Sequence, residues 1–318
     1  MGDPAGRRKT EAARRATYHP CVANGGVTVA TEGPRGFDEA RRKAVRDGLT
    51  LGGLIFDAYL LVVVGPQEHT VGFDAWAYWS VDVEHPYRLG AGALGAFPYS
   101  PVMVRVFAPA HFLAWPTFLF LWLAILVATV IWLGATGEPW WRGWRGALTV
   151  LAFLPVSVEL YHGNVHLLIA AAIALGFRYP AAWEFVLLTK VTPGVGLLWF
   201  AVRREWRRLA IALGVTAAIV VVSLAFDARL WVAWLEEGIL PVIGRQIGQP
   251  AIPIPLWLRL PAAAALVIWG ARTDRRWTVP ASAALALPVL WFAGLSILAA
   301  IWTLDRPALR ETRSVAVR

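Results

Sequence analysis

Long apolar blocks separated by short polar stretches make up the chain from residue 49 to residue 304. Runs this apolar are typical of membrane segments, where a helix satisfies all of its own backbone polar groups. We therefore predict an all-α fold, a polytopic transmembrane helix bundle of about nine or ten membrane segments. We expect the apolar segments at about 49–65, 117–134, 147–160, 165–177, 181–190, 194–202, 209–226, 254–271 and 278–304.

Several of these segments are shorter than the ~20 residues that span a hydrocarbon layer. Two pairs of them are joined by short polar turns, at 161–164 and at 190–193. Such turns must lie below the membrane surface, in a protein-lined or water-filled cavity. We expect a juxtamembrane or partly inserted helix at 102–115, and two short helices broken near Pro288 in the last apolar run.

The polar regions divide the chain into a membrane domain and two tails. Residues 1–48 are rich in charge, Gly and Pro and contain no signal-peptide pattern, so we expect a largely disordered, basic cytoplasmic tail. Residues 49–305 then form the membrane domain, with external loops at about 66–101 and 227–253. A second cytoplasmic tail is expected at 306–318.

Composition and charge agree with this division. The chain is 58% hydrophobic and only 16% charged, whereas soluble domains carry about 25% charged residues, which excludes a soluble globular enzyme. The formal charge of +9 is mainly a topology signal, because 24 of the 30 Lys and Arg residues lie in predicted cytoplasmic segments. We expect a multi-pass plasma (inner) membrane protein with a cytoplasmic N-terminus and no nucleic-acid partner. The single cysteine, Cys21, excludes a disulfide framework.

The first external loop contains a candidate general base, Asp74. Trp76 and Trp79 flank it, and such aromatic surroundings raise the pKa of a carboxylate by desolvation. Tyr78 is four residues further on and lies on the same face of a helical turn. This combination suits a base that acts on a hydroxyl at the membrane surface. The alternative is that Asp74 is a solvated loop or helix-cap residue.

The two short turns contain candidate ligand-binding residues. Lys190 ends an apolar segment, where a charge costs about 2.5–3.5 kcal/mol and needs a partner such as a lipid phosphate. Thr192 opens the next helix, whose free N–H groups can help to hold the same anion. Alternatively, Lys190 snorkels to the interface.

The other turn carries polar side chains that can hydrogen-bond a sugar or a phosphate, or that act only as helix caps: Glu159, His162, Asn164 and His166. Arg245 and Arg259, in or next to the second external loop, are further phosphate candidates. The sequence shows neither a Gly-rich nucleotide loop nor an HExxH zinc motif, so it indicates neither a nucleotide-sugar donor nor a catalytic metal.

A series of short motifs follows the first apolar segment in a fixed order: Asp-x-x-x-Tyr, Pro-Tyr, Tyr-x-Pro, Gly-Asn-Val-His and Lys-x-Thr-Pro. In this order they resemble glycosyltransferase family 87, the polyprenyl-phosphate-sugar-dependent membrane enzymes of the GT-C fold class, over about residues 50–305. The family includes mannosyltransferases that build actinobacterial envelope glycolipids. The matching positions are Asp74, Tyr78, Pro86, Tyr87, Tyr99, Pro101, Gly163 to His166, Lys190, Thr192 and Pro193.

The resemblance implies an inverting sugar transfer with no cofactor and no obligatory metal. Asp74 is expected to be the base, and Lys190 with nearby His or Arg side chains is expected to hold the donor phosphate. The implied partners are the lipid bilayer, a polyprenyl-phosphate sugar (mannose in the first instance) and a glycolipid or glycan acceptor. The residues expected to contact the sugar or the acceptor are Tyr78, Tyr87, Tyr99, Glu159 and Asn164.

Three alternatives remain open on the sequence. A transporter or flippase of lipid-linked sugars also needs intramembrane charges and broken helices, but it predicts two related halves, and none are visible. A non-catalytic membrane scaffold has little use for Lys190 at membrane depth. A degenerate family member binds the lipid without catalysing transfer.

Overall fold

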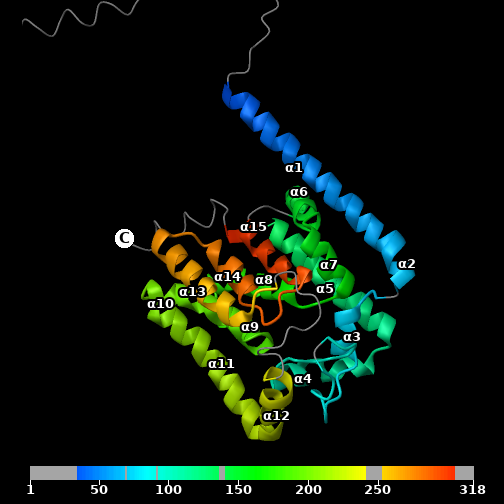
Figure 1. The fold of residues 1–318 in the computed structure, drawn as a ribbon, viewed down its shortest axis with the longest axis vertical. Helices are drawn as coiled ribbons and strands as arrows, with labels where there is room; N and C mark the ends of the chain where they lie inside the picture. Colours follow the sequence, from blue (N-terminus) through cyan, green and yellow to red (C-terminus); the bar gives the residue numbers. More distant parts are fainter. Residues whose placement is uncertain (1–33, 69, 91, 136–139, 241–252, 305–318) are drawn as a thin grey trace, which may run out of the picture. The chain divides into compact units, whose positions relative to one another are not determined.

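The computed structural model describes residues 34–304, apart from 69, 91, 136–139 and 241–252. Every regular element in these ranges is helical, which confirms the prediction of an all-α membrane helix bundle (Figure 1). The chain divides into two compact units, Met1–Val45 and Arg46–Arg318. The second unit contains the membrane domain, and the following description concerns it.

Three helical stretches are long and apolar enough to cross a membrane. They are Lys43–Val64, α5 (Trp115–Ala135) and α11 (Trp206–Phe226), and they match three of the predicted spans. Helix α1 (Pro34–Tyr59) begins well before the first span. The π-helical turn η1 (Leu60–Val64) and α2 (Gly65–Glu68) continue it. Residues 34–48, expected in a largely disordered tail, are therefore helical. The polar residues of this stretch make it unsuited to lipid, but they do not end the helix.

The remaining helices are shorter, as the lengths of the apolar blocks predicted. In chain order they are α3 (Phe73–Trp79), α4 (Pro101–Phe107), η2 (Ala108–Phe112), α6 (Trp140–Leu151), α7 (Leu154–His162), α8 (His166–Gly176), η3 (Pro180–Ala182), α9 (Trp183–Thr189), η4 (Thr192–Leu197), α10 (Leu198–Val202), α12 (Ala228–Ala233), η5 (Trp234–Ile239), α13 (Leu256–Thr273), α14 (Thr278–Leu285), η6 (Phe292–Ala299) and α15 (Ala300–Leu304).

The predicted break near 161–164 is a sharp bend between two helices. Helices α7 and α8 meet at 119°, and together they count as a fourth candidate span or as a re-entrant loop. Gly163 ends α7 with φ +69°, a left-handed conformation that glycine adopts without strain. The break near Pro288 is also confirmed, because α14 ends at Leu285 and η6 begins at Phe292.

Helix α8 lies at the centre of the unit and is apolar on all sides. Leu167, Ile169, Ala170 and Ile173 are fully buried, and the helix packs against α5, α9, η6 and α15. By contrast, α11 leaves its apolar side chains exposed, as expected for a lipid-facing helix. The polar turn before α8 is therefore surrounded by protein, as the rule for non-helical backbone at membrane depth requires.

Candidate functional site

Helix α3 places Asp74 in its first turn, and a glycine fixes where this helix begins. Gly72 has φ +77°, and its amide donates to the carbonyl of Tyr161 at 2.8 Å. A Cβ at Gly72 would lie 2.8 Å from Leu119 Cδ1, so a larger residue does not fit without movement. The end of α7 and the start of α3 are thereby held together.

A second close approach joins α3 to the turn between α7 and α8. A Cβ at Gly163 would lie 2.8 Å from the Cβ of Ala75. Trp122 of α5 donates its indole N–H to the carbonyl of Gly163 at 2.7 Å. The turn is consequently fixed from two sides, next to the residue that follows Asp74.

Asn164 connects Asp74 to the rest of the site and is itself buried. Its Oδ1 accepts hydrogen bonds from the Val165 amide at 2.7 Å and from the Tyr78 hydroxyl at 3.2 Å. With Oδ1 occupied, the amide nitrogen is the group that can donate to the Asp74 carboxylate, with which Asn164 forms a side-chain hydrogen bond. Asn164 thus fixes Asp74 relative to Tyr78.

Burial raises the pKa of the Asp74 carboxyl above its ordinary value. The hydrogen bond from Asn164 and the charge of His162 act in the opposite direction and offset part of this effect. His162 ends α7 and is half-buried, with its ring 6.4 Å from that of Phe73. A carboxylate whose pKa is raised in this way is a stronger base than a solvated one, which suits proton abstraction.

Two buried tyrosines, Tyr78 and Tyr99, interact electrostatically with this carboxylate, and a third, Tyr87, contacts Tyr99. The hydroxyls of Tyr78 and Tyr99 are 2.9 Å apart, and the Tyr87 hydroxyl donates to the Tyr99 carbonyl at 3.1 Å. The Tyr78 ring is stacked on that of Phe107, with 4.7 Å between the ring centroids. Burial raises the pKa of all three phenols, so they remain protonated hydrogen-bond donors.

Glu159, His166 and Lys190 form a second row of polar groups. His166 Nδ1 lies 2.9 Å from Glu159 Oε2, and its Nε2 lies 2.9 Å from Lys190 Nζ. Because a lysine ammonium can only donate, Nε2 is the acceptor in this arrangement and Nδ1 carries the proton given to Glu159. The other oxygen of Glu159 accepts the amides of His166 and Leu167 and so caps α8.

Lys190 joins the two rows. Its Nζ lies 5.8 Å from the centre of the Tyr99 ring, and it interacts electrostatically with the carboxylates of Asp74 and Glu159. The hydroxyl oxygens of Thr192 and Ser100 are buried and have no hydrogen-bond partner among the described residues. Because buried hydroxyls are normally paired, both are suited to bind an oxygen of a ligand.

The structure therefore brings most of the candidate residues together around one buried cluster. Members of this site cluster, the name used below, are Asp74, Tyr78, Tyr87, Tyr99, Glu159, His162, Asn164, His166 and Lys190. Thr192 begins η4, two residues after Lys190. Sequence reasoning missed Ser100, which lies between the two matching residues of the Tyr-x-Pro motif. Glu159, expected to contact a sugar or to act as a helix cap, is fully buried, bonded to His166, and caps α8; a contact with sugar stays a prediction.

Arg259 is placed elsewhere and has a different role. Its side chain is 4% exposed, and its guanidinium donates to the carbonyls of Ile254, Leu285, Leu287 and Pro288 at 2.6–3.0 Å. It therefore ties the start of α13 to the end of α14, and its donors are largely used. Arg245 lies outside the described residues.

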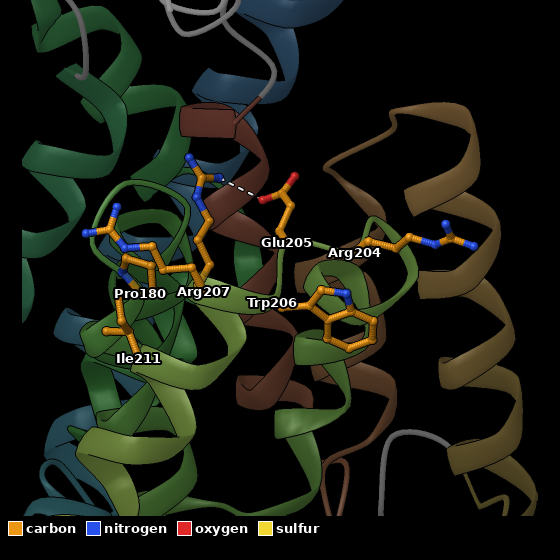
Figure 2. Close-up of a pocket in the computed structure, with 7 residues that line it drawn as sticks. Pro180, Arg204, Glu205, Trp206, Arg207 and Ile211 are labelled. Atoms are coloured by element: carbon orange, nitrogen blue, oxygen red, sulfur yellow. Dashed lines mark hydrogen bonds and ion pairs between the residues drawn. The ribbon is translucent and has the colours of Figure 1, made fainter.

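An open pocket of the structure lies apart from the site cluster. Within the described ranges no group of three or more His, Cys, Asp or Glu side chains could hold a metal ion, and a metal-free reaction stays a prediction. The open pocket, of about 580 Å³, lies where α10 meets α11 (Figure 2).

Comparison with known proteins assigns the chain to a family. No curated protein and no solved structure matches it. The model of glycosyltransferase family 87 matches residues 97–318, more than half of the chain. The matched range includes Tyr99, Asn164 and Lys190, whereas Asp74 and Tyr78 precede it. With its apolar helices, the chain is a membrane glycosyltransferase that belongs to family 87.

Proposed function

We propose that the protein transfers a sugar, mannose in the first instance, from a polyprenyl-phosphate donor to a glycolipid or glycan acceptor of the cell envelope. The reaction takes place on the extracytoplasmic face of the plasma membrane, and Asp74 is the general base. The observation that supports this proposal is the site cluster, which holds a carboxylate of raised pKa and a lysine ammonium in one buried network.

In the proposed reaction, Asp74 takes the proton of an acceptor hydroxyl while the acceptor oxygen bonds to the anomeric carbon. The bond between this carbon and the phosphate oxygen breaks, and its electron pair stays on the departing polyprenyl phosphate. A single displacement on the face opposite the phosphate inverts the anomeric centre. General base catalysis of this kind contributes about 10²–10⁴ in rate.

Lys190 is the group that stabilises the departing phosphate. Thr192 follows it by two residues and has a buried hydroxyl without a hydrogen-bond partner among the described residues, and phosphate oxygens are strong acceptors for both groups. His166 accepts from Lys190 and is itself fixed by Glu159, so the ammonium has a defined direction before the donor binds. Tyr78 and Tyr99 supply protonated hydroxyls for sugar or acceptor oxygens.

The proposal is tested with purified full-length protein, a panel of radiolabelled polyprenyl-phosphate sugars and membrane-extract acceptors. Wild-type protein should transfer one sugar, and Asp74→Asn should insert and fold but lose transfer by about 10²-fold or more. Asp82→Asn is the matched control, because this carboxylate lies in the same external region but outside the site cluster. It pairs with Arg88 at 3.3 Å.

The same preparation separates the alternatives. Substantial transfer by Asp74→Asn would eliminate Asp74 as the base. Donor binding without transfer by the wild type indicates a degenerate lipid-binding protein. Movement of the lipid-linked sugar between leaflets of a proteoliposome, again without transfer, indicates a flippase.

A further inference from the structure

Tyr161 of α7 holds the chain that leads into α3 at two points. Its hydroxyl oxygen lies 2.8 Å from the hydroxyl oxygen of Thr70, and its backbone carbonyl accepts the Gly72 amide at 2.8 Å. The Tyr161 side chain is buried, so both contacts are made beside groups that water reaches poorly. The stretch 70–72 is thereby fastened to a single residue of α7.

The stretch 70–72 determines where α3 begins. The Thr70 carbonyl accepts the Phe73 amide at 3.1 Å, so a turn that starts at Thr70 ends at the first residue of α3. Asp74 is the next residue. Isolated helices need about 12–15 residues to be stable, and α3 has only seven. The position of its first turn therefore depends on the contacts that hold 70–72.

Two further contacts continue along the same pair of segments. Gly163 packs closely against Ala75, and the Asn164 side chain bonds to the Asp74 carboxylate. Successive residues after Tyr161 thus contact the first residues of α3. The Thr70–Tyr161 contact differs from the others because it joins two side-chain hydroxyls. It can therefore be removed with little change in side-chain volume.

Tyr161 is connected differently from the tyrosines of the site cluster. The Tyr78 hydroxyl bonds to the Tyr99 hydroxyl and to Asn164, whereas the Tyr161 hydroxyl bonds to Thr70. A phenol that is bonded to the chain before α3 affects the site through the position of that chain. This arrangement favours a positioning role over a contact with the substrate.

We propose that Tyr161 is a positioning residue for Asp74. Its hydroxyl holds Thr70, Thr70 fixes the turn at the start of α3, and this turn places the Asp74 carboxylate at the acceptor hydroxyl. The inference rests on the proposed function, in which Asp74 is the base. Without the hydroxyl contact, the first turn of α3 samples more positions, and the carboxylate is less often within hydrogen-bond reach of the proton that it removes.

Hydroxyl deletions in the purified full-length protein test this role. Tyr161→Phe and Thr70→Val each remove one hydroxyl and nearly keep the shape of the side chain. We expect each to lower kcat about three- to tenfold, the equivalent of one hydrogen bond, with an unchanged KM for the polyprenyl-phosphate sugar. The double variant should lose no more than either single variant, because both changes remove the same contact.

Two matched variants and a second readout complete the test. Thr70→Ser keeps a hydroxyl at this position and should retain the wild-type kcat. Tyr59→Phe removes the hydroxyl of an exposed tyrosine of α1 and should behave as the wild type does. Hydrogen–deuterium exchange of the amides in 70–79 should become faster in Tyr161→Phe and Thr70→Val, but not in these two controls. Melting temperatures verify that all variants fold.

Three results would overturn the proposal. They are unchanged kcat and exchange in Tyr161→Phe and Thr70→Val, losses that add in the double variant, and a loss that appears only in the KM for the donor. The last of these would make Tyr161 a ligand-binding residue. A wild-type protein that transfers no sugar would refute the proposed function instead, and the exchange rates would still decide whether Tyr161 holds the start of α3.

Discussion

The site cluster and Arg259 both place charge among apolar helices, but they satisfy it differently. Arg259 donates to four backbone carbonyls and so ties α13 to the end of α14. Lys190, in contrast, has a neutral imidazole as its hydrogen-bond partner and lies 5.8 Å from the centre of the Tyr99 ring. Buried charge that is fully paired stabilises a fold, whereas buried charge with spare donors is suited to receive a ligand.

Replacing the charge in the site cluster should have the largest effect on turnover. Lys190→Met keeps the length of the side chain and removes the ammonium. We expect kcat/KM to fall about 10²–10³-fold, as for other groups that stabilise charge on a leaving atom. Thermal stability should change little, because the lost interactions with His166 and the two carboxylates are offset by the removal of a half-buried charge from apolar surroundings. A strong loss of stability would show that Lys190, like Arg259, mainly stabilises the fold.

Glu159→Gln tests whether the row behind Lys190 positions it. Glutamine can still cap α8 with its oxygen, but its amide nitrogen donates to His166 Nδ1 and moves the ring proton to Nε2. Nε2 then no longer accepts from Lys190. We expect about a 10–100-fold loss of turnover, the equivalent of one charge-assisted hydrogen bond, with little change in melting temperature. Equal activity of the two proteins contradicts a positioning role.

The pH profile should respond to His162 more weakly. Asp74 acts as a base only when it is deprotonated, and its raised pKa means that acidification removes activity above the pH expected from an ordinary value of 3.8. The charge of His162 lowers this pKa, so His162→Gln should move the acidic limb of kcat/KM to higher pH. His85→Gln, an exposed histidine of the external region, is the control. A limb that does not move excludes this coupling.

Arg259→Met should leave turnover per folded molecule unchanged and lower stability instead. Four carbonyls lose a charged donor, and each unsatisfied buried acceptor costs about 1–3 kcal/mol, so we expect a loss of about 4 kcal/mol or more. Melting of the detergent-solubilised protein measures this loss, with the exposed Arg272→Met as the control. Lost transfer in a variant of wild-type stability would instead support the phosphate role expected from the sequence.

Much of the fold is predictable from the sequence because apolar blocks and breaks mark helices directly. The short hairpins near 161–164 and 190–193 follow from block length alone, and the polar motifs then indicate where a site lies. The function of Arg259 could not be predicted, since its partners are backbone carbonyls up to 29 residues away and carbonyls carry no sequence signal. The pairing of Glu159 with His166 could not be predicted for a related reason. In a straight helix Glu159 lies two turns from His166, and only the 119° bend brings the two side chains together.

That bend also determines how the protein can accommodate a long lipid. Glu159, Asn164 and His166 belong to one segment of eight residues, and Tyr161 and Gly163 of the same segment hold α3 by close backbone contacts. Asp74 and Lys190 are thus both held against this one segment, through Asn164 and His166. Helix α11, which leaves its apolar side chains exposed, takes no part in these contacts, so we expect a polyprenyl chain to be accommodated beside it without a change in the spacing between base and ammonium. The part of the bundle that accommodates a bulky substrate is then separate from the part that fixes the positions of the reacting atoms.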